Sequence, residues 1–379
     1  MNEQRNYWIA LSMVQGIGPA WFKTLLETFG DAASAWQASP QHLRSTGLNP
    51  DLAEKIVELR QSLDFSVLQA NLAKHGVQAL TQPDEGYPRR LKDIPHSPPV
   101  IYVRGEIAPE DEWAVAVVGT RKMSPYGRQV AEELGAFLAQ QGITLVSGLA
   151  RGVDATAQRA ALAAGGRSIG VLAHGLDRIY PPDNRALGEK MVGQGALVSD
   201  YPLGVHPDSA NFPPRNRIIA GLSIAVVVVE AGHRSGALIT ADFAAEQGRE
   251  VFAAPGNMYS PQSKGTNRLI RDGAHPLLDF EQLLQALDLE YMTQHKSARV
   301  SLPADATEAK LFEVLGREPL HVDEIRAKAD LPIEQVSSTL AVMELKGMVR
   351  QVGGMNYVAV REAHAAYHTD ADAQDRKNE

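Results

Sequence analysis

Between residues 114 and 254 the sequence alternates short apolar runs with helical patterns, and this alternation constrains the fold more than any other feature. The apolar runs occupy 114–119, 143–147, 168–172, 196–198, 224–229 and 250–254. The helical patterns occupy about 125–141, 153–164, 184–193, 215–221 and 237–247. The run SIAVVVVE at 223–230 is apolar on both faces, as a strand buried in a parallel sheet must be. These features predict an α/β fold with a central, doubly wound parallel sheet and right-handed crossovers.

A helical unit is expected before this sheet, over residues 1–70. The stretch LSMVQGIGPAWFKTLLETFG contains two apolar-periodic segments joined by Gly16-Ile17-Gly18-Pro19, and LRSTGLNPDLAEKIVELRQSL repeats the plan around Thr46-Gly47-Leu48. The first stretch resembles a helix-hairpin-helix (SAM-like) unit, whose glycine turn can point backbone N–H groups at a DNA phosphate. Two packed helical hairpins, with glycines that allow tight turns, fit equally well.

A winged helix is expected after the sheet, because three helical patterns are followed by a hairpin that turns at Gly353-Gly354. Its third helix, PIEQVSSTLAVMELKG, carries one basic residue, Lys346, and two glutamates. A helix that reads duplex DNA normally presents several basic or amide side chains, so we expect a protein contact or weak duplex binding. The expected boundaries are 1–70 for the helical unit, 71–290 for the central domain, 291–305 for a linker, 306–360 for the winged helix and 361–379 for a disordered tail.

The distribution of charge leaves nucleic-acid binding open, although the whole chain has a net charge of −8. Residues 114–280 hold 16 Lys and Arg against 14 Asp and Glu, and most of these arginines fall in predicted loops. A local positive groove can therefore exist inside an acidic protein. The N-terminus shows no signal-peptide pattern, and no apolar window approaches ~18 residues. We therefore expect a cytoplasmic protein that does not span a membrane.

The loops that follow the predicted strands carry the candidate binding residues, because ligands of open parallel sheets bind at the carboxyl ends of the strands. Four of these loops combine glycine with hydroxyl or amide side chains and open a helix. They contain Gly119, Thr120 and Arg121; Ser147 and Gly148; Ser235, Gly236 and Thr240; and Asn257, Lys264, Gly265 and Asn267. Helix N-termini present free N–H groups to anions, so four of them at one edge predict a phosphate site.

Arginine and an aromatic residue indicate which kind of phosphate is bound. Arg121, Arg215 and Arg217 can each grip phosphate oxygens with a forked guanidinium, and Lys264 adds a point charge. Ion pairing with Asp154, Glu230 or Asp242 is the alternative, and for Arg217 we expect Glu230 as the partner. Phe212 lies in a proline-stiffened segment beside Arg215, Asn216 and Arg217, where it can either stack on a base or anchor its loop.

Sequence patterns of the common enzyme classes are missing. There is no P-loop, no His-Glu-x-x-His and no Gly-x-Ser-x-Gly, and the chain has no cysteine. His174, His206 and His233 have no evident ligand partner, and we expect them to be solvated or capping. Glu230 is the one plausible acid, and we expect it to hold neighbouring loops. The sequence therefore predicts no catalytic residue, no cofactor and no metal site.

Long blocks of the sequence resemble the DprA/Smf family, the DNA-processing protein A of bacteria. They are GTR at 119–121, SGLARGVDATAQRAAL at 147–162, LAHGLDRIYPPDN at 172–184, PPRNRIIAGL at 213–222, VVVVEAGHRSGALITADFAAEQGREVFAAPGN at 226–257 and SKGTNRLIRDGA at 263–274. The resemblance implies a Rossmann-like domain that binds single-stranded DNA in a positive pocket, helps load the RecA recombinase during natural transformation and forms a homodimer. It implies a protein that is not an enzyme.

The resemblance also assigns the pocket by position. The expected DNA-binding residues are Gly119, Thr120, Arg121, Ser147, Gly148, Phe212, Arg215, Asn216, Arg217, Ser235, Gly236, Thr240, Asn257, Lys264, Gly265 and Asn267. One departure stands out, because the loop GVHPDSAN before Phe212 has no Lys or Arg where relatives often have a basic residue. Backbone N–H groups, arginines and an aromatic ring suit any base, so we expect binding without sequence preference.

Two other functions remain open. Lysine-decarboxylase-like enzymes of the same fold family, which cleave nucleoside monophosphates, carry Pro-Gly-Gly-x-Gly-Thr-x-x-Glu after a late strand. The equivalent segment here, EAGHRSGALITA, lacks the glycine pair and the final glutamate. A nucleotide sensor that binds its ligand near Gly119 and signals through the winged helix is the third possibility.

Overall fold

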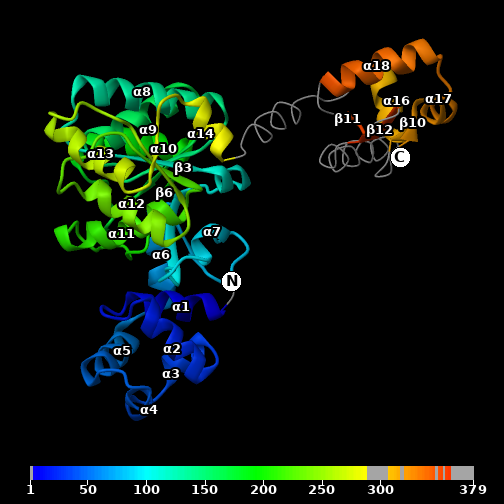
Figure 1. Cartoon of the computed structure of the whole chain (residues 1–379). Helices are drawn as coiled ribbons and strands as arrows, with labels where there is room; N and C mark the ends of the chain where they lie inside the picture. The colour runs from blue at the N-terminus through cyan, green and yellow to red at the C-terminus, as the bar shows by residue number, and fades with distance from the viewer. Residues whose placement is uncertain (1–2, 288–305, 316–319, 346–348, 353–354, 360–379) are drawn as a thin grey trace. The chain divides into compact units, whose positions relative to one another are not determined.

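The computed structural model describes residues 3–287, 306–315, 320–345, 349–352 and 355–359 of the 379-residue chain (Figure 1). The chain divides into two compact units, Met1–Leu283 and Leu284–Glu379, which are described separately below. The expected linker at 291–305 and the expected tail at 361–379 lie outside the described residues.

A nine-stranded sheet forms the centre of the first unit, in the order β1-β2-β6-β5-β4-β3-β7-β8-β9. The strands are β1 (Val77–Thr81), β2 (Val100–Gly105), β3 (Val115–Val118), β4 (Leu145–Ser147), β5 (Ser168–Val171), β6 (Gly195–Ser199), β7 (Ala225–Val228), β8 (Glu250–Ala253) and β9 (His275–Pro276). Strands β3 to β9 run parallel to their neighbours among themselves, which confirms the predicted doubly wound sheet. Strand β3 lies between β4 and β7, so the chain reverses its direction of winding there.

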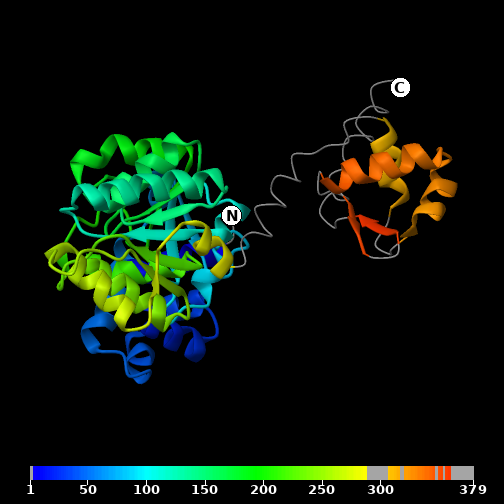
Figure 2. The same cartoon turned by 45° about the horizontal axis from the view of Figure 1, so that its top comes forward.

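Helices cover both faces of this sheet (Figures 1 and 2). They are α7 (Arg89–Lys92), α8 (Pro125–Gln140), α9 (Val153–Ala163), α10 (Arg185–Gly193), α11 (Phe212–Gly221), α12 (Gly236–Glu246), α13 (Lys264–Arg271) and α14 (Glu281–Ala286). Successive strand residues face opposite sides, as in any pleated strand. In β6, for example, Val198 packs in the cluster that contains Ile219 of α11, while Leu197 packs with Met191 of α10.

The amino-terminal edge of the sheet was not predicted in full. A strand at 100–103 was expected, and β2 confirms it, but β1 was missed in the proline-rich stretch before it. Strand β1 pairs antiparallel with β2, and β2 pairs antiparallel with β6. The segment VQALT is short and mixed in polarity, so it gives only a weak strand signal. An antiparallel edge strand also needs no crossover helix, so the strand–helix–strand pattern that marks a parallel strand is missing here.

Six helices precede the sheet: α1 (Glu3–Met13), α2 (Pro19–Phe29), α3 (Ala32–Gln37), α4 (Pro40–Ser45), α5 (Pro50–Ser62) and α6 (Phe65–Lys74). The two predicted hairpins are α1–α2 and α4–α5, which pack around Phe22, Trp36 and Ile56. Gly16, in the first turn, has φ 106°, and a Cβ there would lie 2.7 Å from Leu52. The positive φ favours glycine at this position, while the Leu52 side chain could move aside for a Cβ.

The second unit has the predicted winged-helix pattern. Its elements are α16 (Ala306–Val314), β10 (Leu320–His321), α17 (Val322–Ala329), α18 (Ile333–Leu345), β11 (Val349–Gln351) and β12 (Asn356–Ala359). The three strands form an antiparallel sheet in the order β10-β12-β11, and Phe312, Ile325 and Leu340 lie in the core between the helices. The expected turn at Gly353-Gly354 lies outside the described residues.

Candidate nucleic-acid interface

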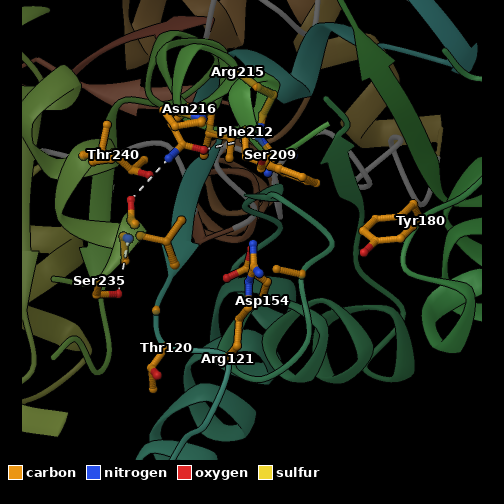
Figure 3. A pocket seen from close by; sticks show the side chains of 18 of the residues that line it. Thr120, Arg121, Asp154, Tyr180, Ser209, Phe212, Arg215, Asn216, Ser235 and Thr240 are labelled. Carbon is orange, nitrogen blue, oxygen red and sulfur yellow. Dashed lines mark hydrogen bonds between the residues drawn. The ribbon is translucent and has the colours of Figure 1, made fainter. Parts of the chain in front are cut away.

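A cleft of about 1100 Å³ opens at the carboxyl ends of the parallel strands, where β3 and β7 lie side by side. Its walls come from the loop after β3, the start of α9, residues 178–182, residues 206–213, the start of α11 and residues 232–240 (Figure 3). This is the switch point of the sheet, where doubly wound proteins bind their ligands. Its volume lies at or above the roughly 300–1,000 Å³ that suits a drug-sized ligand, so it has room for an extended one.

The cleft gathers only part of the predicted set. The predicted residues that line it are Gly119, Thr120, Arg121, Phe212, Arg215, Asn216, Ser235, Gly236 and Thr240. The predicted residues that do not line it are Ser147, Gly148, Arg217, Asn257, Lys264, Gly265 and Asn267. In Figure 3, Arg121 and Asp154 approach the space from one side, while Phe212, Arg215 and Asn216 approach it from the other.

The lining of the cleft is strongly cationic. It contains Arg121, Lys122, Arg178, Arg215 and Arg234, with Asp154 as the one acidic residue. Arg121, Lys122 and Arg234 are exposed, and none of them pairs with a carboxylate of the described residues within 4.0 Å. Unpaired cations in a concave site concentrate the potential there, so the cleft attracts anions although the whole chain is acidic.

Glu230 holds the loop that carries Arg121. Its two carboxylate oxygens accept hydrogen bonds from the backbone N–H of Ser124, at 2.8 Å, and from the Ser124 hydroxyl, at 2.6 Å. Its backbone carbonyl accepts from the N–H of Thr120 at 2.7 Å. The expected structural role of this carboxylate is confirmed, because both oxygens are engaged and the residue is buried. A side chain at Gly127 would collide with it, so α8 can approach only at a glycine.

Arg215 forms the floor of the cleft as a buried cation. It is 5% exposed and donates hydrogen bonds to the carbonyls of Val171 and Gly148, which end β5 and β4. Burial lowers the pKa of its guanidinium to about 10, against the opposing charge of Asp154. Burial likewise raises the pKa of Asp154, while Arg215 opposes that rise. The opposite charges of these two described residues partly compensate each other, although no ion pair within 4.0 Å joins them.

Phe212, at the start of α11, lies near two guanidinium groups. Its ring centroid is 5.7 Å from Cζ of Arg121 and 5.8 Å from Cζ of Arg215, within range of cation–π attraction. The residue lines the cleft and is half-buried, so it contacts both its own domain and the open space.

Arg217 belongs to the structure of the domain, and its predicted partner was wrong. Its Nη2 donates to Asp200 at 2.8 Å, and its side chain is 11% exposed. It also donates to the carbonyls of His96 and Pro214. Glu230 is unavailable to it because Ser124 occupies both carboxylate oxygens.

The other predicted residues outside the cleft build the loops around it. Ser147 is fully buried and donates to the carbonyl of Val117, and the N–H of Gly148 donates to Asp154. The N–H of Gly265 donates to the carbonyl of Ala231 at 2.7 Å. Asn267 bonds both backbone polar groups of Gly256, and Asn257 accepts from the N–H of Tyr259. Lys264 is exposed at the start of α13.

Several lining residues were missed by the sequence prediction: Lys122, Arg178, Tyr180, His206 and Arg234. Arg178 and Tyr180 lie in the segment LAHGLDRIYPPDN, and Arg234 lies directly before Ser235. The resemblance of these segments to the family was noted, but the three residues were not predicted to line the site. Arg178 donates from Nη1 to Nδ1 of His206 at 2.7 Å, which fixes this histidine nitrogen as the acceptor.

His174 was also misjudged. It is 1% exposed, and burial lowers the pKa of its imidazole, so the expected solvated position is wrong for this histidine. Across the described ranges, no three His, Asp or Glu side chains gather closely enough to bind a metal ion. Among the helices that the structure describes, none has the length and hydropathy of a membrane span.

The central domain is a doubly wound α/β domain with a cationic cleft at its switch point, and along the chain it stands between a helical unit and a winged helix. These features are those expected of a nucleic-acid-binding α/β protein. The family model described as "DNA recombination-mediator protein A" matches residues 78–288. Models for the DprA-like N-terminal HHH domain and the DprA winged helix domain match residues 2–56 and 295–355. The chain belongs to the DprA/Smf family of DNA-processing proteins.

Individual relatives agree with this assignment. Protein Smf of Synechocystis is 36% identical over 94% of this chain and 99% of its own length. The X-ray structure of DNA processing protein A from Streptococcus pneumoniae is similar with a TM-score of 0.64 at 33% identity, covering 74% of this chain and 97% of that one. The Helicobacter pylori DNA processing protein A, whose structure concerns its single-stranded DNA binding mode, has a TM-score of 0.51 at 29% identity and covers 56% and 96%.

Proposed function

We propose that this chain binds single-stranded DNA in the cleft and helps load the RecA recombinase onto the bound strand. The observation that carries the proposal is the lining itself, in which the unpaired cations Arg121, Lys122 and Arg234 share one cleft with the aromatic ring of Phe212. Cations that follow a phosphodiester chain, together with rings that stack on bases, are the usual means of holding single strands. The single-stranded DNA binding mode described for the Helicobacter pylori relative supports the same ligand.

Binding is independent of sequence in this proposal. The groups that line the cleft include guanidinium groups, hydroxyls, glycine backbone and the rings of Phe212 and Tyr180, and the amide of Asn216 already donates to the carbonyl of Gly236. A stacking ring accepts any base because every base has a π face. The cations contribute a term that falls steeply with salt, because binding releases counterions from the phosphates.

The role as a recombination mediator rests on the family. The matching model is described by that activity, which suits a protein that holds a strand and passes it to a recombinase rather than changing it chemically. We propose that the chain is not an enzyme and that it acts as a homodimer through its central domain. Glu230, the one acid near the cleft that could have served in catalysis, is engaged by Ser124.

A competition experiment tests the proposal against its alternatives. A fluorescent oligo-dT of about 20 nucleotides is bound first and then challenged with unlabelled oligo-dT, mixed-sequence single strands, blunt duplex or mononucleotides. Both single strands should compete equally, duplex about tenfold less well or worse, and mononucleotides hardly at all. Competition by mononucleotides alone would favour a sensor, and release of free base from a nucleoside monophosphate would favour the enzyme. Either result would overturn the proposal.

A further inference from the structure

Tyr180 faces Phe212 across the cleft, and it was not among the binding residues predicted from the sequence. The two ring centroids lie 6.2 Å apart with an interplanar angle of 43°, and Figure 3 shows Tyr180 on a separate wall from Phe212. Tyr180 is 44% exposed and lines the cleft. The exposed part of the ring is therefore open to whatever the cleft binds.

The spacing of the two rings is close to that needed for a third flat ring between them. Stacked bases are about 3.4 Å apart, so a base held between two parallel rings needs about 7 Å. The observed 6.2 Å is about 1 Å short of that spacing, and the rings are tilted. The exposed Tyr180 ring can make this adjustment by a rotation of its side chain, which costs little and is fast.

Hydrogen bonds on both sides of Tyr180 hold the backbone of its loop in place, so only the side chain needs to move. On one side, Asp177 pairs with Arg178 at 2.7 Å and accepts from the N–H of Gly204. On the other side, the Asn184 amide donates to the carbonyl of Leu149 at 2.9 Å. His174 meets the Tyr180 ring edge-on at 6.3 Å. A flexible ring on a fixed loop is suited to closing on a ligand.

We propose that Tyr180 and Phe212 form a clamp that holds one unpaired base between their rings, with an adjoining phosphate on the unpaired Arg121. This inference rests on the proposed function and adds to it a base-recognition residue, Tyr180. The clamp accepts any base, but it requires that both faces of the base be free. A base stacked and paired within a duplex cannot enter, so the clamp would give the cleft its preference for single strands.

The test compares the full chain with Tyr180→Ala and Tyr180→Phe on two strands of equal length, oligo-dT and a fully abasic strand. Tyr259→Ala is the matched control, because Tyr259 is 84% exposed and lies outside the cleft lining. On oligo-dT, Tyr180→Ala should lose about tenfold in affinity, while Tyr180→Phe and Tyr259→Ala stay within about twofold of the parent. On the abasic strand, Tyr180→Ala should bind like the parent, because there is no base to clamp.

Three results would overturn the clamp. Tyr180→Ala could bind oligo-dT as the parent does, or lose the same factor on both strands, which would mean a merely structural role. An oligonucleotide with 2-aminopurine should show quenching on the parent that Tyr180→Ala reduces, and equal quenching would also contradict the clamp. If Tyr180→Ala does not fold, the same measurements are made with Tyr180→Leu, which keeps an apolar side chain of similar bulk but has no aromatic ring. A parent protein that binds neither strand refutes the proposed function itself, which is a distinguishable outcome.

Discussion

The arginines of the cleft differ in exposure and in the groups that they contact. Arg121 is exposed and unpaired among the described residues, whereas Arg215 is buried beside Asp154 and bonded to two carbonyls. The first can therefore be removed at little cost to folding, while the second cannot. Binding data for Arg215 variants must accordingly be read together with their stability.

Asp154→Asn should reduce the free energy of unfolding by about 3 kcal/mol, because it leaves the buried Arg215 with only the weaker attraction of Asp200. The double variant Asp154→Asn with Arg215→Met should recover part of that loss, since it buries no unpaired charge. Urea unfolding followed by tryptophan fluorescence measures both effects. An Asp154→Asn variant as stable as the parent would show that the charge of Asp154 does not stabilise the buried Arg215.

At the residue scale, the sequence predicts residues that directly follow a strand better than it predicts which distant side chain a residue will contact. Gly119 and Arg121 directly follow β3 and line the cleft, as the convergence of parallel strand ends predicts, whereas Phe212, which begins α11, was assigned to the site from the family resemblance. The partner of Arg217 was wrong because Asp200, which it contacts, lies just beyond a different strand, β6. Tyr180 was missed because an aromatic residue in a proline-rich loop reads equally well as packing.

At the scale of elements, a carboxylate joins α1 to the end of the first strand and makes this junction sensitive to pH. Asp84, after β1, accepts from Arg5 of α1 at 2.6 Å and from the N–H and hydroxyl of Thr81. Burial raises the pKa of Asp84, but these hydrogen bonds outweigh burial and hold it below its ordinary value. A lowered carboxyl pKa stabilises the fold above the unfolded-state value of about 4, and the effect is lost as pH falls through the folded-state value.

Asp84→Asn should therefore lower the free energy of unfolding at neutral pH by about 1–2 kcal/mol, since a charge-assisted hydrogen bond is lost. The difference from the parent should shrink as the pH falls below about 4. Thermal unfolding midpoints at several pH values measure this, with Glu85→Gln, an exposed neighbour, as the control. A deficit that persists unchanged in acid would mean that the carboxylate charge is not what stabilises the junction.

The elements themselves were largely predictable from the sequence. The apolar runs and helical patterns between 114 and 254 became β3 to β8 and α8 to α12, because buried parallel strands and amphipathic helices leave clear periodicities. Strand β1 did not, because pairing with β2 rather than its own sequence makes it a strand.

For the whole molecule, net charge is a poor guide to function. The chain carries −8, yet the cleft lies entirely within the first compact unit and its lining is cationic. In the winged helix, α18 carries Glu334 and Glu344 and no Lys or Arg between Ile333 and Leu345. We therefore propose that single-stranded DNA binds in the first unit.

Deletion of residues 291–379 should leave the affinity for oligo-dT within about twofold of the parent, because the cleft loses none of its lining. Affinity for duplex should also change little. Fluorescence anisotropy with both ligands measures this. A sharp fall in duplex affinity on truncation would show that the winged helix reads duplex DNA despite its charge.

The salt dependence of oligo-dT binding tests the central claim most directly. The parent, Arg121→Ala and the control Arg128→Ala, whose arginine pairs with Glu132 on the exposed surface of α8, are titrated across a salt series. We predict that log Kd rises linearly with log salt for the parent and that Arg121→Ala binds more weakly, with a slope smaller by about 1. Arg128→Ala should follow the parent. Equal affinity and slope for the parent and Arg121→Ala would contradict the account.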